Sequence, residues 1–267
     1  MIFDRRTVAS DVEVGGTGLH SGVPVSVKMR PGEAGIVFRC GSGKWEALPQ
    51  NVTDTRLCTR LGDVSTIEHL MSALAGAEIT DVDIELSAPE LPALDGSALP
   101  FLQALNQASA TIIGTRELPN LFTRVFVQQN DSKLAISRGG GHWRYVFETG
   151  DRWPGHQECE VPSLPVGYER EVAGARTFGF EEQIPELLAA GFAKGLNLET
   201  ALILGTSGYN NDSKWPDEPA RHKLLDAIGD LYLAGVPIRF LNVVAERTGH
   251  AATVQAANLL FQAVHPG

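Results

Sequence analysis

The sequence predicts an α+β fold built from two layered domains of similar make-up. Strand-like and helix-like segments alternate in each half of the 267 residues, without the long βαβ series of a parallel α/β fold. The second half repeats the order of elements of the first but not its residues, so we expect a pseudo-repeat of elements only. The stretch 114–120 (GTRELPN) is the predicted junction, which places the domains at 1–116 and 122–267.

Local patterns predict the individual elements. Residues 1–30 alternate apolar and polar side chains around a glycine-rich turn, which is typical of a hairpin. Helical spacing over 64–79 comes with Ser65 and Thr66 as predicted N-caps. The other elements expected in the first half are a strand over 35–40, a strand and proline-rich loop over 81–97, and a helix over 98–108.

The second half reads in the same way. The expected elements are strands over 121–139 and 142–149, a helix over 180–193, a strand over 200–206, a helix over 220–235, a strand and turn over 238–250, and a closing helix over 250–264. In the helix over 220–235 the apolar residues make one stripe at helical spacing.

Composition excludes several classes of protein. With 43% hydrophobic and 20% charged residues the chain is globular, and a net charge of -10 without a Lys/Arg cluster argues against binding nucleic acid. We find no signal-peptide pattern and no transmembrane segment, and three cysteines without C-x-x-C spacing favour neither a disulfide framework nor a cysteine metal site. A cytoplasmic location is therefore expected; nothing indicates the oligomeric state.

One helix carries polar residues in register. His222, Asp226 and Asp230 fall at i, i+4 and i+8 within 220–235, so they share a face that differs from its apolar stripe. Taken alone, this pattern is most often a solvated polar face. Three further places change that interpretation: the pair Glu68-His69 near the start of a helix, His250 in a glycine turn before the last helix, and a glycine-flanked Arg-Thr-Phe turn at Thr177.

Together these residues supply the parts of a catalytic zinc site. Two imidazoles and one carboxylate (His69, His222, Asp226) suffice to hold Zn²⁺ with a fourth position left for water. Glu68 is placed to accept that water's proton, and His250 to act as a cationic acid. Asp230, one turn beyond Asp226, is expected to orient His250 or Lys223. A glycosidase with two carboxylates is the alternative enzyme class, although no pair of carboxylates stands out.

Seven ordered motifs resemble a known family. GTGLHSG, LCTRL, VSTIEHLMSALAG, PELPALDGSALPF, ARTFGF, RHKLLDAIGDLYLAG and GHA occur in the order seen in the UDP-3-O-acyl-N-acetylglucosamine deacetylases, the zinc enzymes of lipid A biosynthesis. The resemblance runs over nearly the whole chain. It implies two α+β domains, each a helical layer on a sheet, with the active site between them.

The resemblance also implies roles for matching residues. The family's zinc ligands fall on His69, His222 and Asp226, with Fe²⁺ as the alternative metal. Its catalytic residues fall on Glu68 (base), His250 (acid), Thr177 (oxyanion) and Asp230 (support of the acid). Positions near the amphipathic nucleotide-sugar substrate fall on Lys223, Phe178, His20 and Cys58. The implied reaction is hydrolysis of the N-acetyl group of a glucosamine.

Two stretches bear on the substrate. The apolar segment 187–204 is expected to line the passage of the 3-O-acyl chain, with plain core packing as the alternative. The family's usual Asp-Phe-x-His-Pro stretch, whose phenylalanine meets the uracil, is replaced by Thr149–Gly155, in which Trp153 either supplies a stacking surface or packs locally. Two alternatives follow: a paralogue that deacetylates a different N-acylated sugar, and a non-catalytic sugar-nucleotide-binding regulator.

Overall fold

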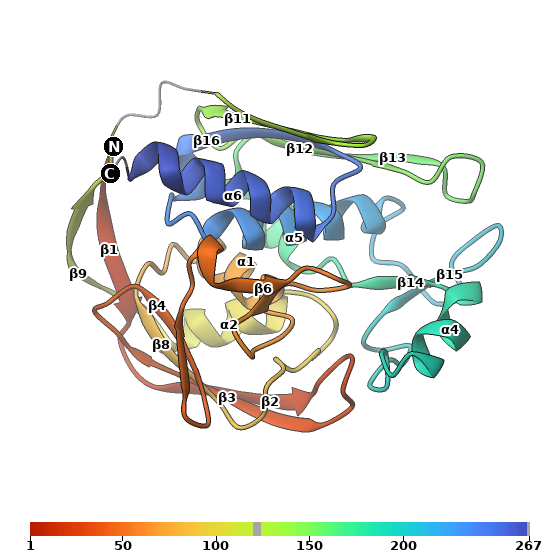
Figure 1. The fold of residues 1–267 in the computed structure, drawn as a ribbon, viewed down its shortest axis with the longest axis horizontal. Helices are drawn as coiled ribbons and strands as arrows, with labels where there is room; N and C mark the ends of the chain where they lie inside the picture. Colours follow the sequence, from red (N-terminus) through yellow and green to blue (C-terminus); the bar gives the residue numbers. More distant parts are fainter. Residues whose placement is uncertain (120–123, 266–267) are drawn as a thin grey trace.

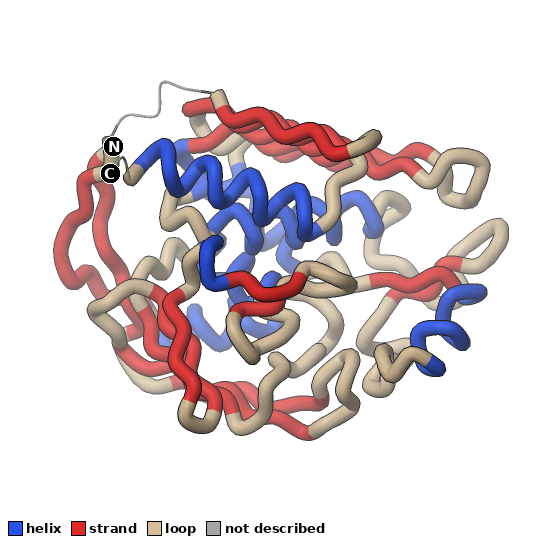
Figure 2. Tube along the Cα trace, viewed as in Figure 1, coloured by secondary structure: helices blue, strands red, loops and turns tan. Residues whose placement is uncertain are grey.

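Two five-stranded sheets enclose a layer of helices in the computed structural model, which describes residues 1–119 and 124–265 (Figure 1). The sheet of the first half lies at the bottom of the view and that of the second half at the top, with α1, α2, α5 and α6 between them. Figure 2 shows the same arrangement, with these four helices in blue between the red strands of the two large sheets. The predicted α+β class, with helical layers on two sheets, is confirmed.

The first half contains nine strands and two α-helices among the described residues. These are β1 (Ile2–Val8), β2 (Val12–Thr17), β3 (Pro24–Pro31), β4 (Ile36–Cys40), β5 (Gly43–Glu46), β6 (Val52–Asp54), β7 (Arg60–Leu61), α1 (Glu68–Gly76), β8 (Val82–Leu86), α2 (Leu99–Ala108) and β9 (Ala110–Glu117).

The described part of the second half contains seven strands and four α-helices. These are β10 (Val125–Gln129), β11 (Ser132–Arg138), β12 (Trp143–Glu148), β13 (His156–Val161), α3 (Leu164–Tyr168), β14 (Phe178–Phe180), α4 (Ile184–Ala189), β15 (Leu202–Leu204), α5 (Glu218–Tyr232), β16 (Leu241–Glu246) and α6 (His250–Val264).

The two large sheets have the same topology. Their orders are β2-β3-β8-β4-β5 and β10-β11-β16-β12-β13, so in each sheet the last strand inserts between two hairpins. In each, this central strand is antiparallel to one neighbour (β3, β11) and parallel to the other (β4, β12). A helix precedes each central strand (α1, α5) and another follows it (α2, α6). The pseudo-repeat expected from element order is therefore present in three dimensions.

Several expected elements differ in detail. The hairpin predicted over 1–30 is β2 paired with β3, whereas β1 pairs with β9 in a separate ribbon. The helix predicted over 180–193 is shorter: Phe180 lies in β14, and α4 covers Ile184–Ala189. The predicted junction 114–120 begins inside β9, and the boundary at 122 lies outside the described residues, so the division at 116 and 122 stays a prediction.

The predicted N-caps of α1 are wrong. The N-cap is Ile67 and no side chain caps it. Thr66 adopts a left-handed backbone with φ of 62°, and its hydroxyl donates to Glu90 Oε1 at 3.4 Å. A left-handed β-branched residue is a strained conformation that the surrounding structure must hold in place. The chain enters α1 through a sharp turn in place of a capping box.

The helices at the centre are buried on nearly every side. Every residue of α1 before its last glycine is buried, and so are most residues of α5. A helix enclosed between two layers must have small or apolar residues around its whole circumference, or polar residues that satisfy one another. No helix in the described ranges is both long and apolar enough to cross a membrane.

A buried carboxylate ties β1 to the first large sheet. Asp81, just before β8, accepts hydrogen bonds from Arg5 Nη2 at 2.6 Å, the Gly35 amide at 2.8 Å and the Thr80 hydroxyl at 2.6 Å. Burial raises the pKa of Asp81, but these hydrogen bonds outweigh it and hold the pKa below its ordinary value. The carboxylate therefore stabilises the fold as an anion.

We expect Asp81→Asn to lower the free energy of unfolding at pH 7 by about 1–3 kcal/mol, because an amide cannot accept all of these bonds. The carboxylate's contribution is present above its unfolded pKa of about 3.9 and is lost as the pH falls through the lower folded value. The difference from wild type should therefore shrink below about pH 4, which urea unfolding between pH 7 and pH 3 measures. Asp83→Asn, at a half-exposed site on β8, is the control and should change stability by less than about 0.5 kcal/mol. Equal stability of Asp81→Asn and wild type at pH 7 would contradict this account.

Candidate active site

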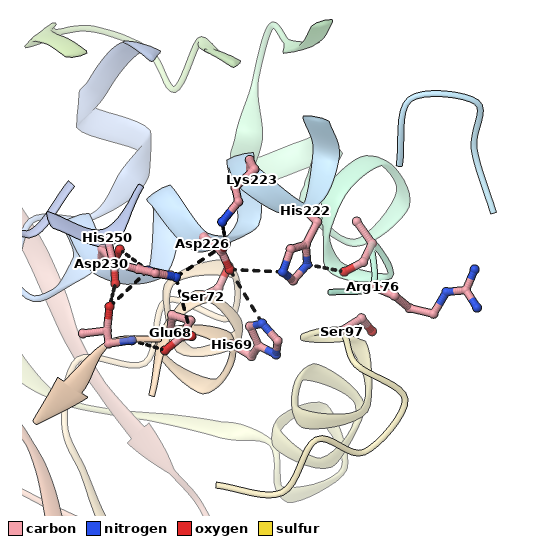
Figure 3. A network of polar contacts seen from close by, with 12 residues as sticks. Glu68, His69, Ser72, Ser97, Arg176, His222, Lys223, Asp226, Asp230 and His250 are labelled. Carbon is pink, nitrogen blue, oxygen red and sulfur yellow. Dashed lines mark hydrogen bonds and ion pairs between the residues drawn. The ribbon is translucent and has the colours of Figure 1, made fainter. Parts of the chain in front are cut away.

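Two imidazoles and a carboxylate converge where α1 packs against α5 (Figure 3). His69 Nε2 lies 3.6 Å and His222 Nε2 lies 3.4 Å from Asp226 Oδ1, and the three donor atoms all lie within 4.8 Å of one another. All three side chains are buried. The geometry thus brings together the three residues that the sequence singled out as metal ligands.

The tautomer of His222 directs a lone pair toward this cluster. Its Nδ1 is 3.0 Å from the Ala175 carbonyl oxygen, which can only accept, so Nδ1 carries the proton and Nε2 faces Asp226 unprotonated. Burial lowers the pKa of His222 to about 3, although the Asp226 charge raises it. A neutral imidazole held by a backbone carbonyl is the usual form of a metal-binding histidine.

Asp226 is an anion with one free oxygen. Oδ2 accepts a hydrogen bond from Lys223 Nζ at 2.8 Å, whereas Oδ1 is buried and has no hydrogen-bond partner among the described residues. Burial raises the pKa of this carboxyl, but the Lys223 ammonium and the nearby His250 cation outweigh burial and hold the pKa well below its usual range. A buried carboxylate oxygen without a donor carries a desolvation cost, which a cation between it and the two imidazoles would relieve.

A second group of polar residues adjoins the first. His250 Nδ1 lies 2.9 Å from Asp230 Oδ2, and the Thr253 hydroxyl donates to the same oxygen at 2.6 Å. Thr59 donates its hydroxyl to Asp230 Oδ1 at 2.6 Å and its backbone N–H to Glu68 Oε2 at 3.0 Å. His250 Nε2 faces Glu68 Oε1 at 3.9 Å. An imidazole and a carboxylate therefore face each other beside the first cluster.

The surroundings set the charges of this pair. Burial lowers the pKa of His250, but the Asp230 carboxylate, with Glu68 and Asp226, outweighs it and raises the pKa to about 9. Burial raises the pKa of Glu68, a shift that the neighbouring imidazoles oppose. At neutral pH His250 can donate a proton from Nε2, and burial increases the proton affinity of the Glu68 carboxylate. One group can give a proton where the other can take one.

A cavity of about 550 Å³ opens onto both clusters. The loop between α4 and β15 is hydrogen-bonded to the turn that carries His20: the Lys194 N–H donates to the His20 carbonyl at 3.3 Å and the Gly195 N–H to the Leu19 carbonyl at 3.0 Å. The loop and the turn both contribute residues to the cavity lining. Apolar side chains dominate the wall away from the polar clusters. The apolar lining residues are Leu19, Leu57, Phe178, Phe180, Leu187, Ala190 and Phe192.

Other predicted site residues also lie at this cavity. Thr177, Phe178, His20 and Lys223 line it. Phe178 contacts the His222 ring edge-on, with ring centroids 6.0 Å apart. The turn that carries His20 is anchored by the buried Glu90, which accepts the His20 N–H at 2.7 Å.

Two predicted features lie apart from the cavity. Cys58 is buried, and it is not among the described residues that line the cavity; burial raises its pKa to about 12, so the thiol is protonated. Trp153 packs locally, edge-on against Tyr209 with ring centroids 4.6 Å apart. Its neighbour Arg152 stacks over the Phe180 ring, 3.2 Å from the centroid, and so joins the 149–155 loop to the cavity wall.

Comparisons with known proteins point to one family. The profile of the UDP-3-O-acyl N-acetylglycosamine deacetylase family (LpxC) matches residues 5–262. The chain belongs to this family. A protein of Anaeromyxobacter dehalogenans (strain 2CP-C) named UDP-3-O-acyl-N-acetylglucosamine deacetylase is 38% identical over 262 residues, which cover 93% of this chain and 84% of that protein. A protein of the same name from Acidithiobacillus ferrooxidans (strain ATCC 53993 / BNL-5-31) is 35% identical over 285 residues, covering 97% and 89% respectively.

The family match over residues 5–262 covers every residue of the site described above. Sequence reasoning assigned no role to Thr59, Glu90 or Thr253, although the first two lie inside the motifs LCTRL and PELPALDGS. Their hydrogen bonds join segments that are distant in sequence, and neither periodicity nor spacing reports such pairings. The position of Thr59 and Glu90 inside two of the matching motifs was the available signal.

A glycine sets the separation of α1 and α5. A Cβ added at Gly229 would lie 2.0 Å from the Glu68 carbonyl oxygen, a contact that forces the two helices apart. We therefore expect Gly229→Ala to destabilise the protein by roughly 1–3 kcal/mol through overpacking, although alanine ordinarily favours a helix over glycine. Displacement of α1 would also separate His69 from Asp226, so affinity for a divalent ion should fall about 10–100-fold.

Thermal unfolding and zinc titration of the metal-free protein measure the two effects. Gly140→Ala is the control, because a Cβ there meets nothing within 4 Å. Wild-type stability and metal affinity in Gly229→Ala would show that the helix separation does not depend on this residue.

Proposed function

We propose that this protein is a zinc-dependent amidohydrolase that removes the N-acetyl group of a UDP-3-O-acyl-N-acetylglucosamine in lipid A biosynthesis. The observation that carries the proposal is the convergence of His69, His222 and Asp226 beside the facing Glu68 and His250, at the end of a largely apolar cavity. Membership of the deacetylase family and the names of the two relatives support the same reaction.

The donor set fits zinc. Tetrahedral ligands about 2.0–2.1 Å from Zn²⁺ are roughly 3.3–3.4 Å apart, and two of the donor separations are 3.4 and 3.6 Å. Two imidazole nitrogens and one carboxylate oxygen are ligands that Zn²⁺ accepts in catalytic sites, and Fe²⁺ suits the same set. A bound ion of this kind supplies Lewis-acid chemistry, which polarises an amide carbonyl and acidifies a water.

Glu68 and His250 are placed to carry out the proton transfers. Glu68 is held by the Thr59 N–H at Oε2, which leaves Oε1 to accept the proton of an attacking water. His250 is held by Asp230 at Nδ1, so its Nε2–H can donate to the departing amine nitrogen. The Thr177 backbone is fixed between Gly96 and Leu202, and its side chain borders the cavity, where the hydroxyl can donate to the carbonyl oxygen as negative charge develops.

The cavity supports a substrate with an acyl chain. Leu187, Ala190 and Phe192, from the start of the apolar segment 187–204, line it, and Leu202–Leu204 are buried as β15. Lys223 borders the cavity as well and brings a cation that can meet the polar part of the substrate. The proposed passage for the 3-O-acyl chain therefore uses the first part of the segment, and its end packs in the core.

The experiment that tests the proposal is a substrate panel. Zinc-loaded protein is incubated with N-acetylglucosamine derivatives that carry or lack UDP and a 3-O-acyl chain, and free amine and acetate are measured. We expect release from the UDP-3-O-acyl compound. Release only from compounds without UDP would favour a paralogue for another sugar, and binding of UDP-sugars without release from any of them would favour a non-catalytic regulator.

Substitution of the proton-transfer pair should remove activity and leave metal binding intact. We expect Glu68→Gln and His250→Gln each to lower kcat about 10²–10⁴-fold, the usual contribution of a general base or acid. Asp226→Asn should instead lose the metal, because it removes a ligand charge. Elemental analysis alongside kinetics separates the two classes. Full activity in either glutamine variant would exclude the proposed role of that residue.

A further inference from the structure

Thr59 lies where three helices meet. It sits between β6 and β7 and is 0% exposed. Its carbonyl accepts the Ile67 N–H at 3.2 Å at the start of α1, and its N–H donates to Glu68 Oε2 at 3.0 Å. The backbone of Thr59 thus fixes both the entry of α1 and one oxygen of the proposed base, and turns the other oxygen toward His250.

The hydroxyl of Thr59 reaches the opposite half of the chain. It donates its single proton to Asp230 Oδ1 at 2.6 Å, and its oxygen is 3.2 Å from His250 Nδ1. His250 Nδ1 also lies 2.9 Å from Asp230 Oδ2, so Nδ1 is the protonated nitrogen and the threonine oxygen is its second acceptor. The three side chains form a closed ring of hydrogen bonds.

This ring restricts side-chain rotations that helix packing alone does not restrict. Asp230 belongs to α5 and His250 to α6, while Thr59 comes from a loop 171 residues earlier than Asp230 in the chain. Packing of the helices places their backbones, but a carboxylate can still rotate about its last bond and an imidazole about its Cβ–Cγ bond. Thr253 on α6 donates to Oδ2 of Asp230 only, and the Thr59 hydroxyl holds the other oxygen, Oδ1. Thr59 therefore completes the restraint on the Asp230 carboxylate and, through it, on His250.

We propose that Thr59 is a positioning residue that couples the base and the acid of the proposed deacetylase. Its N–H aims Glu68, and its hydroxyl locks Asp230 and, through it, His250. The kinetic consequences of this inference rest on the proposed function, whereas the hydrogen-bond ring does not depend on it. Thr59 contacts none of the three residues His69, His222 and Asp226 in the described hydrogen bonds, so it should not affect metal content.

Two variants isolate the hydroxyl. Thr59→Val keeps the shape and the N–H to Glu68 and removes only the hydroxyl, whereas Thr59→Ser keeps the hydroxyl. We expect Thr59→Val to lower kcat about 10–100-fold, with KM and zinc stoichiometry unchanged, and Thr59→Ser to stay within about threefold of wild type. The control is Ser72→Ala on α1, which removes another buried hydroxyl, 2.8 Å from Tyr168 Oη, and should leave kcat unchanged.

A spectroscopic readout does not depend on activity. In zinc-loaded protein the His250 Nδ1–H should give a downfield proton resonance that exchanges slowly with water, assigned by its absence in His250→Gln. We expect faster exchange in Thr59→Val, and slow exchange in Thr59→Ser and Ser72→Ala. An inactive wild type with this NMR pattern would overturn the proposed function but support the ring. Three results would overturn the positioning role. They are an unchanged exchange rate in Thr59→Val, a kcat of Thr59→Val within threefold of wild type, and a kcat of Thr59→Ser as low as that of Thr59→Val.

Discussion

The closeness of α1 and α5 is the constraint on which the site depends. Gly229 lets the Glu68 carbonyl approach α5 so closely that no larger residue fits. At this separation His69, on α1, faces His222 and Asp226, on α5. Because both helices are buried, these side chains cannot move out to solvent, and their geometry is that of the core.

Burying so many ionisable groups is tolerable because their charges compensate. Asp226 has the Lys223 ammonium on one oxygen, His222 is neutral, and the His250 cation lies against Asp230. An unpaired charge at this depth would cost several kcal/mol, so each anion requires its cation. Asp226 Oδ1 has no hydrogen-bond partner among the described residues, and it is the oxygen that would bind the proposed metal.

The pseudo-repeat explains why the site lies at the centre. α1 and α5 hold equivalent positions in the two halves, each just before the central strand of its sheet. Packing the two helical layers face to face brings equivalent helices together, so each half contributes part of the site: Glu68 and His69 from one, His222 and Asp226 from the other. Thr59 adds a further bond across the same boundary.

The class of fold, most of the long elements and the three proposed metal ligands could be predicted from the sequence, because these depend on local periodicity and on residues with distinctive chemistry. The closing helix was predicted with the bounds it has, and His250 begins it as expected. The i, i+4 spacing of His222 and Asp226 needed only a helix to place both side chains on one face. The tertiary structure was needed to show that β1 pairs with β9, that Thr66 is left-handed and caps nothing, and that Thr59 and Glu90 anchor the site. Those features join segments far apart along the chain, and a pairing of that kind is set by packing between elements, which no local pattern encodes.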